Sequence, residues 1–130
     1  GKANDTHMSP TLLDGVTREM RLWREESFGP VKAIIRVHSE EEALAVANDS
    51  EYGLSAAVYS RDSARAWNVA QRLHTGICHI NGPTVHDEAQ MPFGGCKASG
   101  YGRFGGRAGI AEFTELRWIT IQTQPRELPF

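Results

Sequence analysis

The chain has 130 residues, of which 40% are hydrophobic and 23% charged, and this ordinary globular composition excludes a disordered, collagen-like or disulfide-scaffold protein. Fourteen Lys and Arg against sixteen Asp and Glu give a net charge of -2, so we expect no nucleic-acid partner and no membrane partner. Two cysteines are too few for a disulfide framework, so we expect a reducing, cytoplasmic location.

The first half of the chain contains one clear strand and one clear helix. Residues 1–30 show no sustained period, and a Gly-Pro pair ends them in a predicted turn. Val31 to Val37 is rich in β-branched residues and predicts a well-buried strand. Ser39 and Glu42 have the spacing of a capping box, which predicts a helix from there to about Asn48.

The same pattern then repeats further along the chain. Leu54 to Tyr59 is a short apolar run and predicts a buried strand. Asp62 to Leu73 carries an apolar stripe at helical spacing, and Ile77 to Ile80 predicts a third strand. Alternating strands and helices are typical of right-handed parallel crossovers, so residues 31–81 predict half of an α/β sheet.

The regular pattern stops after residue 81. Gly82 to Gln90 is polar and Gly94 to Gly109 is rich in glycine, and loops of this length usually carry function. Ile110 to Thr114 is expected to end a short helix. Apolar and polar residues partly alternate from Leu116 to Gln122, which predicts a final strand.

Three features suggest chemistry but have simpler explanations. Gly100 to Gly105 spells the dinucleotide fingerprint G-x-G-x-x-G, but it follows no strand and opens no βαβ unit, so we favour glycines that permit close packing. The histidines form no ligand pair, so we expect no metal site; they are His7, His38, His74, His79 and His86. Cys78 is interpreted as a core residue, and Cys96 lies in a loop without a neighbouring base.

The sequence around Glu25 and Glu26 permits two interpretations. An acid two residues from the aromatic Phe28 can bind sugar hydroxyls while the ring packs on a flat ligand. On the residues alone, a solvated acidic pair beside a core phenylalanine is the favoured interpretation.

Five runs, in order along the chain, resemble the aldehyde dehydrogenase superfamily. The first resembles the signature E-E-x-F-G-P-V, and the set is Arg24–Val31, Ala47–Val58, Gly76–Asn81, Pro92–Arg103 and Phe113–Glu115. Together they cover about Glu25 to Ile121, and chance does not explain five matches that follow the same order along the chain. Ile80 to Phe93 further resembles the branch of salicylaldehyde, benzaldehyde and vanillin dehydrogenases.

The resemblance implies an α/β fold: the C-terminal part of the aldehyde dehydrogenase catalytic domain, with a parallel βαβαβ unit and a terminal oligomerisation strand. Residues 1–98 would be a partial catalytic domain, with the βαβαβ unit at about 31–81 and a substrate loop at 82–98. Residues 99–115 would be a Gly-rich loop and short helix, and residues 116–130 the oligomerisation strand and tail. Since the chain lacks an initiating Met, we expect it to be a fragment of a longer protein.

The resemblance also implies the activity. A complete enzyme would use NAD or NADP to oxidise an aldehyde to the carboxylic acid. The resemblance to the branch named above favours an aromatic aldehyde. Glu26 would bind the nicotinamide-ribose hydroxyls, and Phe28 would pack near the nicotinamide ring. The aldehyde entrance would be shaped by Val85, His86, Asp87, Gln90 and Phe93.

The same comparison places the catalytic cysteine and the general-base glutamate outside this chain, which alone would be inactive. A homo-oligomer, dimer or tetramer, is implied by the terminal strand. The alternative is a non-catalytic oligomerisation or partner-binding module whose exposed sheet edge pairs with another chain.

Overall fold

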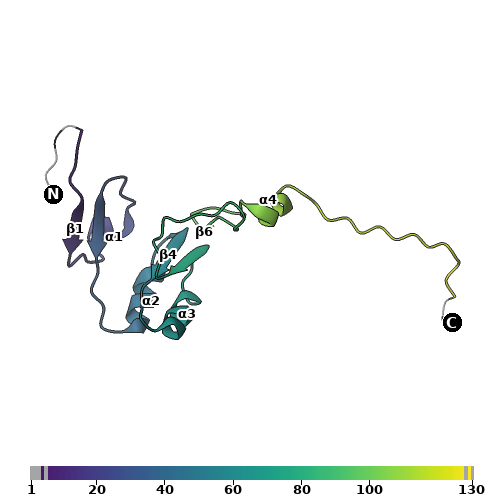
Figure 1. The fold of residues 1–130 in the computed structure, drawn as a ribbon, viewed down its shortest axis with the longest axis horizontal. Coiled ribbons are helices and arrows are strands. Elements are labelled where there is room, and N and C mark those ends of the chain that lie inside the picture. The colour runs from purple at the N-terminus through teal and green to yellow at the C-terminus, as the bar shows by residue number, and fades with distance from the viewer. Residues whose placement is uncertain (1–3, 5, 128, 130) are drawn as a thin grey trace.

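The computed structural model describes residue 4, residues 6–127 and residue 129 (Figure 1). The predicted partial catalytic domain (residues 1–98) and the predicted strand and tail (residues 116–130) include residues 1–3, 5, 128 and 130, which lie outside the described residues. The chain order of elements is β1 (Thr11–Asp14), α1 (Arg21–Arg24), β2 (Val31–Ile34), α2 (Glu40–Asn48), β3 (Tyr52–Gly53), β4 (Ser55–Val58), α3 (Ser63–Ala70), β5 (Ile77–Ile80), β6 (Cys96–Lys97) and α4 (Gly106–Glu112).

The strands of the described residues form three separate pairs. Strands β4 and β5 are parallel, with Ser55 opposite Ile77, which confirms one predicted crossover. Strand β2 pairs with β1 rather than with β4, so the prediction of one continuous sheet over residues 31–81 is wrong. Its partner β1 has only four residues, too few to show a period within a segment that otherwise lacks one. Strands β3 and β6 form a short antiparallel pair.

Helix α2 begins with the predicted cap and ends at Asn48 as predicted. The Ser39 Oγ accepts a hydrogen bond from the Glu42 backbone N–H at 3.1 Å. The Glu42 carboxylate accepts from the His38 N–H at 2.7 Å, one residue before the position expected in a capping box. The bond to Ser39 satisfies one backbone donor that the first turn of a helix leaves open, and the bond from His38 fixes the residue before the cap.

Helix α3 packs on β4 and β5. The Asp62 carboxylate caps α3 by accepting from the Arg65 N–H at 3.0 Å. Helix α3 ends at Ala70, three residues before the predicted end, and a turn follows. The small core of the described residues includes Leu44 of α2, 5% exposed, and Ala66 of α3, 1% exposed.

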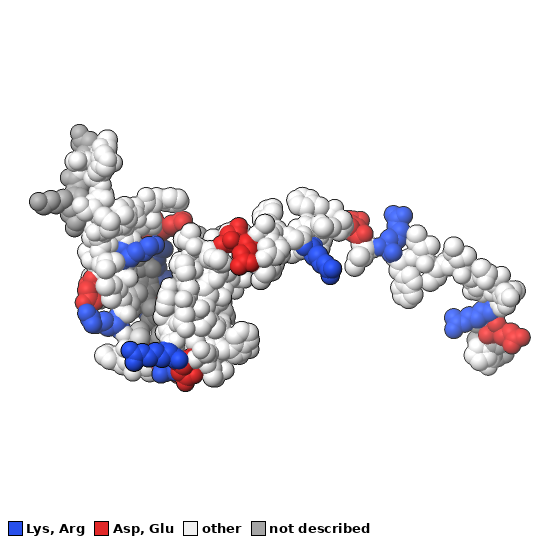
Figure 2. Space-filling model, viewed as in Figure 1, with Lys and Arg blue, Asp and Glu red and all other residues white. Residues whose placement is uncertain are grey.

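Ion pairs join the two helices on their solvent side. The Arg65 Nε lies 2.7 Å from a Glu40 oxygen, and Arg72 pairs with Glu41. On the face shown in Figure 2, basic and acidic side chains lie interspersed along the molecule. Among the described residues, no helix is long and apolar enough to cross a membrane.

Burial of β2 differs from the prediction. We expected a well-buried strand over residues 31–37, but the strand ends at Ile34 and most of its residues are exposed. The cause is the position of β2. Strand β1 is its one strand partner among the described residues, and neither α2 nor α3 packs closely on it.

The last part of the chain also differs from the prediction. Helix α4 begins at Gly106 and ends at Glu112, earlier than expected. The predicted strand at residues 116–122 is absent from the described residues, and this segment runs away from the fold in extended form (Figure 1). Trp118 is 89% exposed there. The prediction concerned pairing with another subunit or with an arm outside this chain, so it stays a prediction.

One glycine of the G-x-G-x-x-G sequence, Gly105, lies where backbone segments approach closely. A Cβ on Gly105, which has a positive φ of 86°, would lie 2.2 Å from the Met91 carbonyl oxygen. A Cβ on Gly102 would lie 2.9 Å from a Glu112 carboxylate oxygen. At Gly105 this geometry agrees with the packing interpretation, because a larger residue would clash with backbone; at Gly102 the positive φ of 73° disfavours other residues.

Candidate functional site

A groove of about 650 Å³ lies between the loop after α1, the end of α2 and the start of β4. Its lining includes Glu26 from the loop and Val85 from the segment after β5. The Ser55 Oγ of β4 donates to the Thr84 carbonyl at 3.0 Å and so fixes that segment beside the strand. The structure thus brings together two predicted site residues separated by 59 positions in the sequence (85 minus 26).

The neighbouring acids Glu25 and Glu26 have different surroundings. Arg21 lies one helical turn before Glu25 and pairs with its carboxylate at 2.7 Å. The hydrogen bond from Arg21 lowers the pKa of Glu25 below its ordinary value, because it favours the ionised carboxylate. Among the described residues, the structure records no hydrogen bond or ion pair for the Glu26 carboxylate, so its oxygens are available to accept from a ligand.

Phe28 follows groove-lining residues in the sequence but is not itself part of the lining. Its side chain is 96% exposed, in the loop between α1 and β2. The interpretation as a core phenylalanine is therefore wrong. A ring in this position contacts a flat ligand only if that ligand extends out of the groove.

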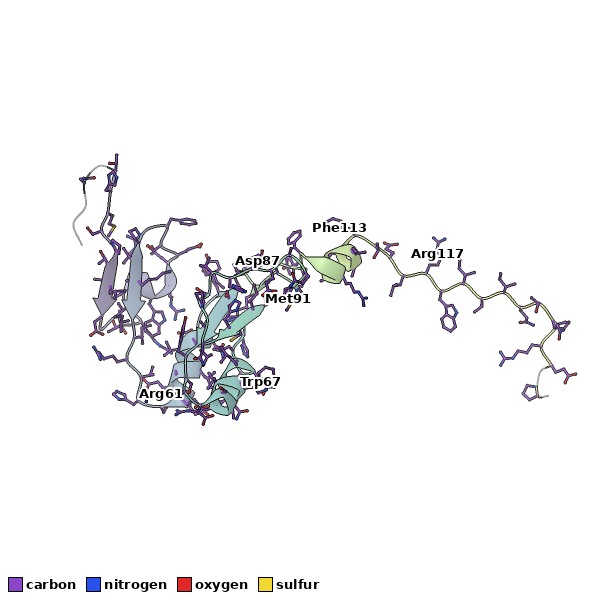
Figure 3. All side chains as sticks on the ribbon, in the orientation of Figure 1. Arg61, Trp67, Asp87, Met91, Phe113 and Arg117 are labelled. Carbon is purple, nitrogen blue, oxygen red and sulfur yellow. The ribbon has the colours of Figure 1, made fainter. Side chains whose placement is uncertain are left out.

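A second, smaller pocket of about 380 Å³ lies between strand β5 and the loop that follows it. We call it the loop pocket, and its lining includes Ile77, Cys78, His79, His86, Asp87 and Phe93. Three of the predicted aldehyde-site residues therefore share one pocket. Figure 3 shows Asp87 together with Met91 in the stretch between β5 and α4.

Backbone contact forms one wall of the loop pocket. A Cβ on Gly76, at the start of β5, would lie 1.9 Å from the Gly94 carbonyl oxygen. Only glycine permits this approach, which brings the far end of the loop onto β5. Phe93 also forms an antiparallel bridge with Phe104, and the two backbone hydrogen bonds of this bridge measure 2.8 and 2.7 Å.

A row of polar side chains extends along the loop pocket. The rings of His79 and His86 lie edge to face, with centroids 5.5 Å apart. The His86 Nε2 lies 3.3 Å from a Glu88 oxygen, and the Gln90 amide donates to the other Glu88 oxygen at 2.5 Å. Gln90 thus supports the loop rather than lining the pocket.

Sequence reasoning missed His79 and Glu88 as members of this site. His79 was grouped with the histidines that lack a ligand partner, although it lies on a predicted strand that leads directly into the loop. The alternation of side chains in a strand places Ile77 and His79 on one face, and this signal could have identified the residue.

Neither cysteine has the surroundings of a nucleophile. Cys78 lies in β5, and burial raises the pKa of its thiol, which disfavours the reactive thiolate. The Cys96 Sγ donates to the carbonyls of His74 and Gly53 at 3.3 and 3.5 Å. Within the part of the chain that the structure describes, no three His, Cys, Asp or Glu side chains are grouped to hold a metal ion.

The described geometry therefore contains a groove with an available carboxylate beside a partly apolar pocket, and comparison with known proteins gives its family. The sequence profile "Aldehyde dehydrogenase family" matches residues 1–119. The chain belongs to the aldehyde dehydrogenase family.

Similar proteins include a vanillin dehydrogenase of Pseudomonas fluorescens, which is 63% identical over 129 residues, or 99% of this chain. A salicylaldehyde dehydrogenase of Pseudomonas putida is 50% identical over all of it. A crystal structure of a salicylaldehyde dehydrogenase from Pseudomonas putida G7, complexed with salicylaldehyde, superposes on the whole chain with a TM-score of 0.90 and 51% identity. These matches confirm the predicted branch of the family.

The chain spans only part of these proteins. It covers 27% of the length of each of the two relatives and 27% of the crystallised chain. The fold of the chain is therefore that of a portion of an aldehyde dehydrogenase.

Proposed function

We infer that this chain is the C-terminal quarter of an NAD(P)-dependent aldehyde dehydrogenase that oxidises an aromatic aldehyde to its carboxylic acid. The observation that carries this proposal is the 63% identity with a vanillin dehydrogenase over nearly the whole chain. Relatives named for benzaldehyde, at 44% identity, and salicylaldehyde, at 50%, support the aromatic class.

The groove supports binding of the cofactor. Solved relatives with 42% and 40% identity contain NAD+ and NADP+ respectively. A carboxylate without a recorded partner among the described residues suits the hydroxyls of a ribose, since each hydroxyl can donate a hydrogen bond to an ionised oxygen. Glu26 would hold the ribose, and the exposed Phe28 would cover the nicotinamide ring once it is bound. NAD(P)+ would supply the hydride acceptor.

The loop pocket supports binding of the aldehyde. Its apolar members Ile77 and Phe93 would pack on an aromatic ring, and His86 and Asp87 would face its polar substituents. Val85 lies in the lining of the groove, where it would separate aldehyde from cofactor. Gln90 would act indirectly through its hydrogen bond to Glu88.

The nucleophilic cysteine and the general base would come from the rest of the polypeptide. Cys78 has a raised pKa and Cys96 is engaged with two carbonyls, so neither suits covalent attack on an aldehyde. The chain alone is then inactive, and the whole enzyme would be a cytoplasmic homo-oligomer.

A second candidate is a non-catalytic oligomerisation or partner-binding module. The exposed apolar side chains after α4 favour it, namely Phe113, Leu116, Trp118, Ile119 and Ile121. Burying them against another chain would be favourable at about 25 cal/mol per Å².

The test compares the full-length polypeptide with this chain alone. Vanillin, salicylaldehyde and benzaldehyde are supplied with NAD+ or NADP+, and formation of reduced cofactor is followed. We expect turnover by the full-length protein and none by the chain of 130 residues. A full-length protein that is inactive with all three aldehydes, but is oligomeric through residues 116–122, would favour the second candidate.

A further inference from the structure

The loop that carries Glu26 is attached to the rest of the fold at one polar point. We propose that Asp49, at the end of α2, is a positioning residue that holds α1 so that Glu26 faces the groove. This inference rests on the proposed role of Glu26 in binding the cofactor.

Three side chains converge on the carboxylate of Asp49. The Trp23 Nε1 donates to Oδ2 at 3.4 Å. The guanidinium groups of Arg18 and Arg24 lie 3.5 and 3.6 Å from the same oxygen. Arg18 also lies over the Trp23 ring, with its guanidinium carbon 5.6 Å from the ring centroid. Arg18 and Trp23 therefore contact each other as well as the Asp49 carboxylate.

Asp49 itself is firmly placed. Its backbone N–H donates to the carbonyls of Ala45 and Val46 at 3.0 and 3.2 Å and caps the helix. The preceding Asn48 bonds through its side chain to the Arg72 carbonyl at 2.9 Å and to the His74 N–H at 2.8 Å. The carboxylate therefore extends from a point that is tied to both α2 and the turn between α3 and β5.

No second attachment of this kind occurs between residues 17–28 and the remainder of the described chain. Every other recorded hydrogen bond or ion pair of this segment is internal to it, such as the pair of Arg21 with Glu25. Glu26 follows Arg24 by two residues, so a displacement of α1 moves its carboxylate directly. Asp49 is 29% exposed on its side chain, which reduces screening of its charge by water.

The test uses the full-length polypeptide and its preferred cofactor, NAD+ or NADP+. The dissociation constant is measured by titration calorimetry without aldehyde, so that the readout does not depend on turnover. We expect Asp49→Asn to raise this constant by about fivefold, within the range of coupling between neighbouring groups, while KM for the aldehyde changes less than about twofold. Asp49→Glu keeps the charge and is expected to recover at least half of the affinity.

Two controls separate positioning from general stability. Asp14, in strand β1, pairs with Arg36, and neither residue lines the groove. Asp14→Asn breaks this ion pair and should leave cofactor affinity unchanged. In a Glu26→Gln background, Asp49→Asn should have no further effect, because the group that it positions is already altered.

The outcomes distinguish this inference from the proposed function. If Asp49→Asn lowers thermal stability but not affinity, or if its effect adds fully to that of Glu26→Gln, Asp49 is only structural and the inference is wrong. If Glu26→Gln itself leaves affinity unchanged, the proposed role of Glu26 fails, and the inference fails with it.

Discussion

Residues 40–80 and residues 113–127 both contain regularly spaced apolar side chains, yet they have opposite structures. The first segment contains two capped helices and a parallel strand pair, with Leu44 and Ala66 buried. The second contains no helix or strand, and every one of its residues is exposed. Apolar content alone does not explain this difference.

The difference lies in where each segment finds its partners. In residues 40–80, the helix caps, the ion pairs and the pairing of β4 with β5 all come from groups within the same segment. Residues 113–127 extend from the fold, as the labelled Phe113 and Arg117 show (Figure 3), and Trp118 is 89% exposed. We expect the surface that covers these residues to belong to another chain.

The largest expected effect comes from Gly76, at the start of β5. A methyl group there would meet the Gly94 carbonyl at 1.9 Å, so Gly76→Ala should cost about 3 kcal/mol of stability in residues 40–80. Amide hydrogen exchange across β5 measures the loss. Gly29→Ala is the control, because its Cβ would meet only the Ser27 Oγ at 3.9 Å. Unchanged exchange in Gly76→Ala would contradict the close contact.

The same substitution in both segments tests the comparison directly. Leu44→Ala removes a side chain that is 5% exposed and should cost about 2 to 3 kcal/mol. Leu116→Ala removes a fully exposed side chain and should change stability by less than about 0.5 kcal/mol. Both are measured by hydrogen exchange in α2 and β5. Equal losses would show that residues 113–127 already pack within one chain.

Helix capping gives a smaller effect. Ser39→Ala removes the acceptor for the Glu42 N–H and should cost about 1 kcal/mol, seen as faster exchange in the first turn of α2. Thr123→Ala, in the exposed segment, should have no measurable effect. Loss of protection in β5 but not in α2 would argue against a local cap.

The smallest effect concerns pH. The hydrogen bond from Arg72 lowers the pKa of Glu41 below its ordinary value. The ion pair therefore stabilises the fold above the ordinary pKa of a glutamate, and this contribution is lost as pH falls through the lowered value. Glu41→Gln should make stability less dependent on pH below about 4.5 in acid titrations. Identical acid profiles for Glu41→Gln and the unmodified chain would contradict the pairing.

Local signals in the sequence predicted the elements of residues 40–80 well. The Ser39 cap, the end of α2 at Asn48 and the bounds of β5 are confirmed, because each depends on residues close in sequence. The pairing of β2 with β1 was missed, since the register of a parallel pair depends on partners that no local pattern specifies. The strand expected at 116–122 stays a prediction, because its expected partner lies outside this chain.

The candidate site was predicted in part. Residues matched to family motifs fall around the groove and the loop pocket, but only the structure separates Glu25, which is paired with Arg21, from the available Glu26. Contacts between distant positions, such as Asp49 with Trp23, cannot be read from spacing.

The loop after β5 is fastened at both of its ends by backbone groups. Near one end the Thr84 carbonyl accepts from Ser55, and at the other Gly94 rests against Gly76. Side chains between these points, at residues 85–91, are mostly exposed and take no part in either contact. We therefore expect substitutions at these positions to reshape the loop pocket without disturbing the register of β4 and β5. Ligand preference should be adjustable at this loop while the fold around it stays the same.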